Sequence, residues 1–147
     1  MQPTKQPIGT VAYIANSRVP EAFAWSFTQL LCCCYEYACP PGTYIHPDHS
    51  IGSGQILARN ELVKKMQGDW LLQIDSDHTF DPDLLLRMLQ LFEGNKLDVL
   101  CGIYHMKEPP HNPVLYQYQD GEYKAILNWG QRDEVKLLPI EIGRAHV

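Results

Sequence analysis

The sequence contains neither a long apolar run nor a basic run. No apolar stretch reaches the roughly 20 residues of a membrane-spanning helix, and the N-terminus lacks a signal-peptide pattern. Lys and Arg number 12 against 17 Asp and Glu, a net charge of −5, which argues against nucleic acid as a main partner. We therefore expect a cytoplasmic protein that has no membrane span and binds no nucleic acid.

A disulfide pattern is also missing. The five cysteines are odd in number, three of them are consecutive at Cys32–Cys34, and none forms a C-x-x-C motif. A zinc site made by Cys34, Cys39, His46 and His49 is a minor alternative, because its spacing fits no standard zinc motif. We expect the thiols to act as small buried hydrophobic side chains.

The composition is that of a globular domain. The chain has 147 residues, of which 45% are hydrophobic, and this suggests one domain with a sizeable core. Residues 1–9 are expected to be a loose lead-in. The last seven residues, 141–147, resemble translated read-through of a sequencing adapter. We therefore expect residues 10–140 to be an incomplete domain, the tail to be non-native and the chain to be a C-terminally truncated fragment.

Strand and helix patterns alternate along the chain. Strands are predicted at residues 10–15, 70–74 and 98–104, and helices at 20–34, 55–67 and 82–93. A short strand is expected within residues 36–46, a loop at 47–54, and a further strand at 135–140. Asp120-Gly121, between residues 114–119 and 122–127, is a hairpin signal. The pattern predicts an α/β fold with a mixed, mostly parallel sheet flanked by helices and extended by the hairpin.

The most informative stretch is Trp70–Phe80, where an apolar run ends in Asp75 and Asp77. We expect this run to be a buried central strand. Open α/β sheets bind ligands just beyond the carboxyl ends of their strands, so both acids lie where a ligand would bind. Neighbouring carboxylates repel unless a positive charge lies between them, and their oxygens suit Mg²⁺ or Mn²⁺.

Taken together, these motifs resemble family-2 glycosyltransferases of the GT-A fold. The resemblance covers most of the chain and rests on the following features: the first strand and its polar loop, the A-R-N-E helix at Ala58–Glu61, the D-x-D motif at Asp75–Asp77, the helix after Pro82, and residues 99–104. In that family the D-x-D motif holds a divalent cation on the diphosphate of the sugar donor.

The resemblance implies a Rossmann-like GT-A sheet, a nucleotide-diphosphate sugar donor, a sugar, lipid or protein acceptor, and Mn²⁺ or Mg²⁺ as cofactor. It makes Asp75 and Asp77 the metal ligands. It places Asn16, Arg18, Arg59, Asp75 and Ser76 in contact with the nucleotide-sugar. Inverting members take their catalytic base from a later segment, where Glu141 and Gly143 fall here. Both belong to the suspected tail, so no catalytic residue is assigned.

A haloacid-dehalogenase-type phosphatase is the first alternative. Its motif, a hydrophobic strand followed by D-x-D-x-T, matches Ile74–Thr79, with Asp75 as nucleophile and Asp77 as acid/base. That motif usually lies on the first strand, whereas two strand-helix patterns precede Asp75. The later lysine and acidic motifs have no clear counterpart in this chain.

Two further alternatives concern binding or structure alone. A calcium loop would use Asp75, Asp77, Thr79, Asp81 and Asp83, but Phe80 and Leu86 replace the turn glycine and the closing glutamate. Alternatively the acids cap the next helix, which explains Asp81 well and Asp75 poorly.

Other residues near these motifs have weaker signals. His78 is either a metal neighbour or a surface residue. Tyr104 and His105 either line an acceptor pocket or form a plain connection. Trp25 and Trp129 either stack on a sugar or belong to the core or surface.

Overall fold

A computed structural model describes residues 5–15, 17–52, 54–102, 109–110 and 116–125. The chain divides into two compact units, residues 1–93 and 94–147, and each is described by itself.

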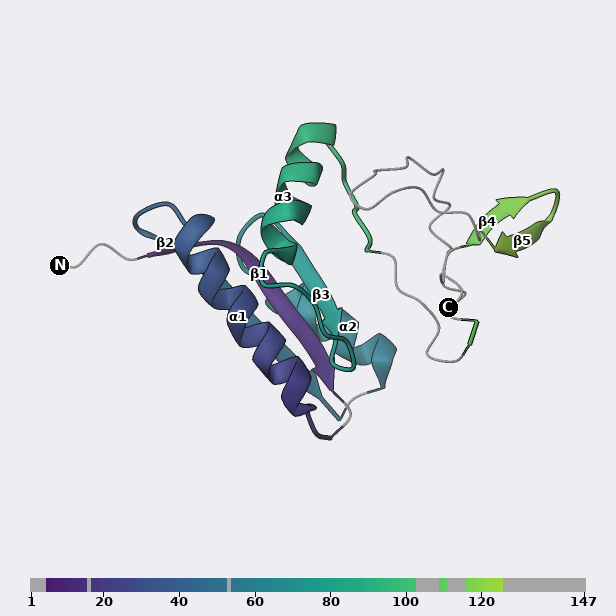
Figure 1. The fold of residues 1–147 in the computed structure, drawn as a ribbon, viewed down its shortest axis with the longest axis horizontal. Helices are drawn as coiled ribbons and strands as arrows, with labels where there is room; N and C mark the ends of the chain where they lie inside the picture. The colour runs from purple at the N-terminus through teal and green to yellow at the C-terminus, as the bar shows by residue number, and fades with distance from the viewer. Residues whose placement is uncertain (1–4, 16, 53, 103–108, 111–115, 126–147) are drawn as a thin grey trace. The chain divides into compact units, whose positions relative to one another are not determined.

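The first unit is built on a three-stranded parallel sheet. Its strands are β1 (Gln6–Ala15), β2 (Thr43–Ile51) and β3 (Leu71–Asp75). Their order across the sheet is β2-β1-β3, and both pairings are parallel (Figure 1). The middle of β1 is fully buried, as Val11 and Ala12 show, because it has a strand on each side and helices over both faces. The predicted α/β class with a mostly parallel sheet flanked by helices is confirmed, and the described sheet of this unit is open and entirely parallel.

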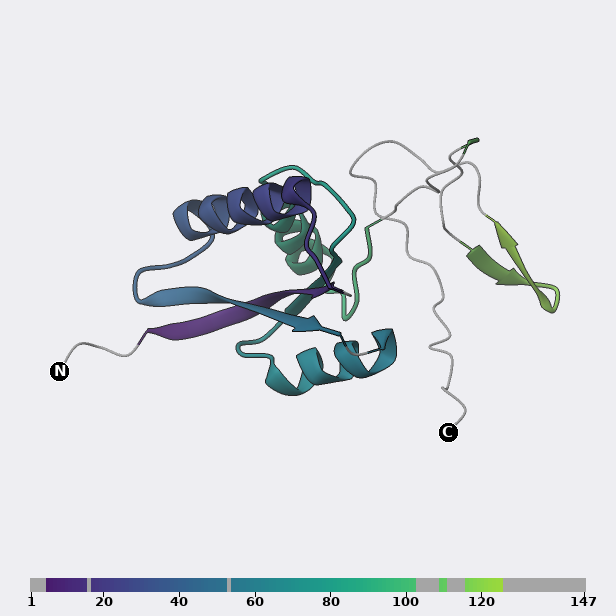
Figure 2. The same ribbon diagram turned by 90° about the horizontal axis from the view of Figure 1, so that it is seen from below.

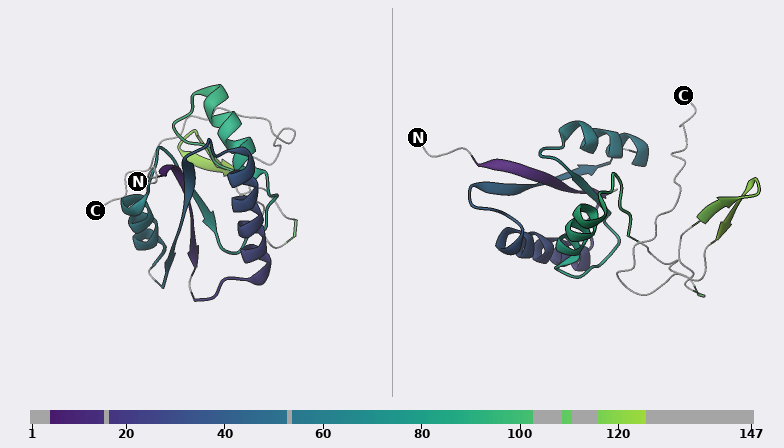
Figure 3. Two further views of the ribbon diagram at one scale, coloured as in Figure 1. Left: turned by 90° about the vertical axis from the view of Figure 1, so that its left-hand side faces the viewer. Right: turned by 90° about the horizontal axis from the view of Figure 1, so that it is seen from above.

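Helices cover both faces of this sheet. Helices α1 (Glu21–Tyr37) and α3 (Leu84–Asn95) lie on one face and α2 (Gln55–Lys65) lies on the other (Figure 2). Figure 3 shows α1 and α2 on opposite sides of the strands. This three-layer arrangement buries the apolar side chains that point to either face of β1.

The two faces of β1 contribute to separate hydrophobic clusters. On the side of α1 and α3, the buried members of the cluster are Val11, Leu30, Cys34, Ile45 and Leu85. On the side of α2, Ala12 and Ile14 pack with Ala58 and Leu62. The predicted buried stripes of the first two helices are therefore confirmed at Leu30, Cys34, Ala58 and Leu62.

β1 begins at Gln6 rather than at the predicted Thr10. The Gln6 N–H donates to the Gly42 carbonyl at 3.1 Å, and the pairing with β2 shifts register between Pro7 and Gly9. Since proline has no N–H to donate, this part of the strand is irregular, and its polar composition concealed it in the sequence.

β2 is longer than predicted. It runs from Thr43 through Pro47 to Ile51, so the predicted loop at 47–54 was wrong over residues 47–51. A proline is tolerated because β2 pairs only with β1 among the described strands, and an edge strand can turn the proline nitrogen away from its neighbour. The prediction that Pro47 lies in a loop did not take into account that edge strands tolerate proline.

β3 lies at the other edge of the described sheet and β1 in its centre, whereas a central position was predicted for β3. Its residues Leu71–Ile74 are half-buried and Asp75 is exposed. A continuous apolar run predicts burial of both faces, and here both faces are only partly covered.

The helix ends differ by a few residues from the prediction. α2 ends at Lys65 instead of Gln67, because Met66 is extended with ψ of 144°. α3 begins at Leu84 after a turn that Asp81 closes by accepting from the Leu84 N–H at 3.1 Å. It continues through Gly94 to Asn95 and is followed by Lys96 in a left-handed conformation, with φ of 52°.

The second unit contains the predicted hairpin. Strands β4 (Tyr116–Gln119) and β5 (Glu122–Ala125) pair in antiparallel fashion around Asp120 and Gly121, whose φ angles of 54° and 87° are those of a type I′ turn. Among the described strands this hairpin forms a two-stranded sheet of its own. Residues 98–102 of the predicted strand at 98–104 are not a strand, and the predicted strand at 135–140 lies outside the described residues.

Within the described ranges, no helix has both the length and the apolar composition that crossing a membrane requires.

Candidate functional site

The three parallel strands end at one edge of the sheet, and their last residues bring polar groups together. Ile14 of β1 lies in register between Ser50 of β2 and Asp75 of β3. This carboxyl edge is where open α/β sheets bind ligands. The predicted position of Asp75 at the end of its strand is therefore confirmed.

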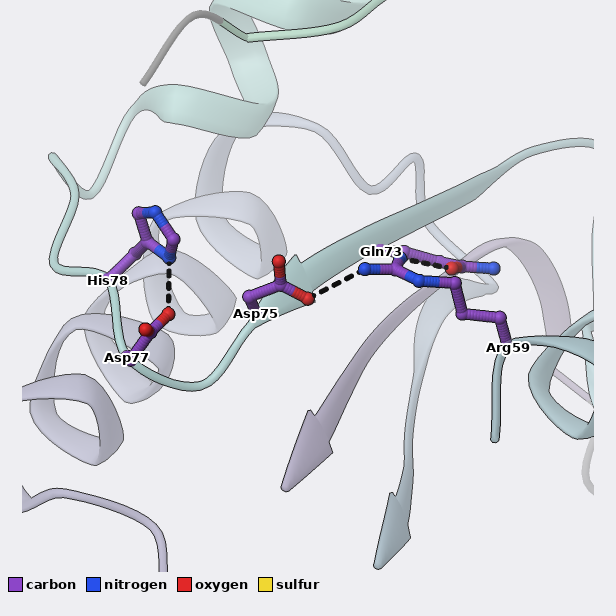
Figure 4. Close-up of polar contacts among 5 residues, drawn as sticks. All are labelled: Arg59, Gln73, Asp75, Asp77 and His78. Atoms are coloured by element: carbon purple, nitrogen blue, oxygen red, sulfur yellow. Dashed lines mark hydrogen bonds and ion pairs between the residues drawn. The ribbon is translucent and has the colours of Figure 1, made fainter. Parts of the chain in front are cut away.

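Asp75 is held by Arg59 of α2. The Arg59 Nη2 donates to Asp75 Oδ1 at 2.8 Å, and Arg59 Nη1 donates to Gln73 Oε1 at 2.9 Å (Figure 4). Gln73 and Asp75 are two residues apart on β3, so their side chains point to the same face. Within the described residues Asp75 Oδ2 has no protein partner. One carboxylate oxygen is thus bound and one remains available.

The A-R-N-E segment explains how Arg59 reaches the strand. Ala58 and Leu62 are fully buried against β1, which fixes the rotation of α2. The buried Ser50 of β2 donates from Oγ to Glu61 Oε2 at 3.1 Å. Because Glu61 reaches β2 and Arg59 reaches β3, the helix is tied to both outer strands of the sheet.

Asp77 lies in the turn after β3. Its Oδ1 is 2.8 Å from the Nδ1 of His78, an ion pair only when the imidazole is protonated. Figure 4 shows Asp75 directed towards Arg59 and Asp77 towards His78. The two carboxylates therefore have different neighbours, and the side chains of Asp77 and His78 are 50% and 37% exposed.

The chemistry of the two acids suits a cation that is shared with a ligand. Within the described residues no group of three or more His, Cys, Asp or Glu is placed to hold a metal ion. Mg²⁺ sites in enzymes commonly use one or two carboxylates and take their other ligands from substrate phosphates and water. Asp75 and Asp77 supply two such carboxylates, so the donor set suits a metal that binds together with a phosphorylated substrate.

The zinc alternative was wrong. Cys34, Cys39, His46 and His49 all lie within the described residues and form no metal-binding group. Cys34 is fully buried, and burial with its neighbours Cys33 and Cys39 raises the pKa of its thiol to about 12. Zinc requires the thiolate, which this environment disfavours.

The calcium-loop alternative was also wrong. It requires Asp81 and Asp83 to face the same ion as Asp75, yet both acids pair with Arg87, at 3.3 Å and 3.2 Å. Arg87 lies on α3 one turn further along the chain. These two acids therefore stabilise the start of that helix, as the capping interpretation expects for Asp81.

The remaining predicted residues are less well defined. Ser76 lies in the turn between the two acids, and Arg18 is exposed in the loop after β1. Trp25 is 65% exposed on α1, so it is not a core residue. The following predictions fall outside the described residues: Asn16, Tyr104, His105, Trp129, Glu141 and Gly143.

Gln73 takes part in the site through its bond to Arg59, although the sequence motifs did not indicate it. The available signal was a polar side chain in an apolar strand, two residues before an acid. This spacing places both on one face of a strand, next to a helix that carries an arginine.

Comparison with known proteins shows the family of this chain. The model of the family described as glycosyl transferase family 2 matches residues 36–139. The chain is 39% identical over 64 residues to chitin synthase chs-1 of Caenorhabditis elegans. The matched stretch is 43% of this chain and 4% of that relative, so the chain spans only a small part of its length. No solved structure gave a significant match.

Proposed function

Because the chain belongs to glycosyl transferase family 2, we propose that it moves a sugar from a nucleotide-diphosphate sugar to an acceptor at the carboxyl edge of the β2-β1-β3 sheet. The observation that supports this most is the position of Asp75, which ends β3 at that edge and keeps one carboxylate oxygen available. Chitin synthase, the relative from C. elegans, is named for making chitin, and we extend to this chain only the class of reaction.

Two carboxylates at this edge need a positive partner to bind a diphosphate. We assign Asp75 and Asp77 as the residues that would hold Mn²⁺ or Mg²⁺. When bound, such a cation offsets the negative charge of the departing nucleoside diphosphate. Arg59 already neutralises part of the charge on Asp75. The sequence has a net charge of −5 and contains no basic run that could neutralise the diphosphate, which leaves this task to a cation.

Further residues that follow the ends of the strands in the sequence would border the nucleotide. Asn16 and Arg18 follow β1, and Ser76 lies between the two acids. A guanidinium and short polar side chains suit the phosphates and the ribose hydroxyls of a donor. The base that deprotonates the acceptor is assigned to no residue, and the cytoplasmic location stays a prediction from the sequence.

Calorimetry tests the proposal directly. UDP- and GDP-sugars are titrated into the full chain with and without Mn²⁺, for the wild type and for Asp77→Ala. We expect nucleotide binding that depends on Mn²⁺ and is lost in the variant. Asp69→Ala is the matched control, because Asp69 is an exposed acid just before the first residue of β3, away from the carboxyl edge.

Other outcomes separate the alternatives. If the wild type binds no nucleotide in the presence of Mn²⁺, or Asp77→Ala binds as the wild type does, the proposal fails. Hydrolysis of a generic phosphate ester with an aspartyl-phosphate at Asp75 would favour the phosphatase instead.

A further inference from the structure

We infer that Arg59 and Gln73 are positioning residues, which orient the Asp75 carboxylate so that Oδ2 faces the donor. The inference rests on the proposed function and goes beyond it by assigning Arg59 an indirect role. The resemblance alone implied a direct contact between Arg59 and the nucleotide.

The geometry of the guanidinium supports this role. Its two terminal nitrogens donate to two acceptors on one strand, Gln73 Oε1 at 2.9 Å and Asp75 Oδ1 at 2.8 Å (Figure 4). Two bonds from one planar guanidinium fix its plane, and a donor fixed in this way restrains its acceptor more than a mobile donor would. Gln73 therefore sets the plane of Arg59, and Arg59 in turn limits rotation of the Asp75 carboxylate.

The helix that carries Arg59 cannot shift easily. Ala58 and Leu62 are completely buried against β1, and Glu61 accepts from the buried Ser50 on the other outer strand. The Arg59 backbone is consequently fixed relative to β3. A side chain supported in this way holds its target more precisely than a free surface arginine would.

The pair contributes little to folding, which makes a role in the site testable. Arg59 and Asp75 side chains are 42% and 48% exposed, and ion pairs at that exposure are typically worth at most about 1 kcal/mol. A preoriented carboxylate, in contrast, saves the cost of ordering when the ligand binds. Loss of the contact should therefore weaken ligand binding clearly and change the melting temperature only slightly.

Two variants remove the orientation in different ways. Arg59→Lys keeps the positive charge and loses the fork, and Gln73→Met keeps the side-chain volume and loses the acceptor. With UDP and Mn²⁺ as the probe and the full chain as the protein, we expect each to lower affinity by about 10-fold. The controls are Lys64→Met, which removes an exposed positive charge further along α2, and Gln90→Met, an exposed glutamine on α3.

A double-mutant cycle separates an indirect from a direct role. The effect of Arg59→Lys is measured again in an Asp75→Ala background, by NMR titration, which reaches millimolar dissociation constants. If Arg59 acts through Asp75, the second substitution has no further effect. A loss of the same size in both backgrounds would mean that Arg59 contacts the nucleotide itself and would overturn the inference.

The measured outcomes distinguish a failure of the proposed function from a failure of the inference about Arg59. If the wild-type chain shows no Mn²⁺-dependent binding of UDP, both the proposed function and the inference fail. If binding depends on Asp77 but is unchanged by Arg59→Lys and Gln73→Met, only the inference fails. A lower melting temperature with unchanged affinity would show a purely structural role and would also overturn it.

Discussion

Thr10 and Gln67 are joined by two hydrogen bonds across 57 residues of sequence. The Thr10 hydroxyl donates to the Gln67 carbonyl oxygen at 2.8 Å and accepts from the Gln67 N–H at 2.7 Å. Thr10 is fully buried in the central strand, and Gln67 lies in the connection from α2 to β3. The two bonds therefore fix where β3 begins beside β1, and thus which face Asp75 occupies.

Thr10→Val should destabilise the protein by about 1–3 kcal/mol, because the Gln67 N–H and carbonyl would lose their buried partner. Urea unfolding followed by circular dichroism measures this. Thr28→Val is the matched control: its hydroxyl donates to the Ala24 carbonyl on exposed α1, and its removal should change stability by less than about 0.5 kcal/mol. Equal effects of both substitutions would contradict the assigned role of Thr10.

Gly9→Ala should also destabilise the protein, by about 1–3 kcal/mol, because the added methyl group would collide with the indole ring of Trp70. The same unfolding measurement tests it. Gly94→Ala has open space around the new methyl group and lies within α3, so it should stabilise by about 0.5–1 kcal/mol. A Gly9→Ala variant as stable as the wild type would show that Trp70 moves without cost.

Ser50→Ala should cost about 0.5–1.5 kcal/mol, because the buried hydroxyl donates to Glu61. Glu61→Gln should cost less, since its amide oxygen can still accept this bond. A double-mutant cycle with Ser50→Ala and Glu61→Ala, read by thermal unfolding, should give a nonzero coupling energy. Simple additivity would mean that this bond does not secure α2.

Cys34 should resist alkylation at pH 8 while Cys32 and Cys101, which are exposed, react. Burial raises the pKa of the Cys34 thiol from its ordinary value of 9.0 to about 12, so the reactive thiolate is scarce. Mass spectrometry after iodoacetamide treatment, with and without urea, checks this. Labelling of Cys34 in the folded protein as fast as labelling of Cys32 would contradict its burial.

The same pKa shift predicts a dependence of stability on pH. A raised folded-state pKa means that the contribution is complete below pH 9.0 and is lost as pH rises towards about 12. The free energy of unfolding of the wild type should therefore fall more steeply between pH 9 and 11 than that of Cys34→Ala. Parallel curves for the two proteins would refute this.

The sequence was sufficient to predict an element where one local pattern determined its structure. The helical spacing that includes Phe23, Leu30 and Cys34 predicted the buried face of α1, and Asp120-Gly121 predicted the hairpin, because each signal depends on neighbours only. The position of Asp75 at a strand end followed equally from the apolar run before it.

Features that depend on distant partners were not predictable. The second part of β2, residues 47–51, was hidden because an edge strand with one exposed face and a proline shows no clear alternation. The apolar segment 98–102 looks like a strand, yet a strand requires a partner, which sequence pattern alone cannot supply. The contact from Arg59 to Gln73 and Asp75 likewise needed the register of β3 and the rotation of α2.

Pro47, in the outer strand β2, has a consequence for the behaviour of the protein in solution. An unpaired rim of backbone donors and acceptors invites strands from other molecules, and repeated addition of this kind leads to aggregation. A residue without an amide hydrogen leaves a gap in that row of donors. Because β2 is an outer strand among the described ones, we expect Pro47 to make the addition of a strand from a neighbouring molecule at this edge less favourable.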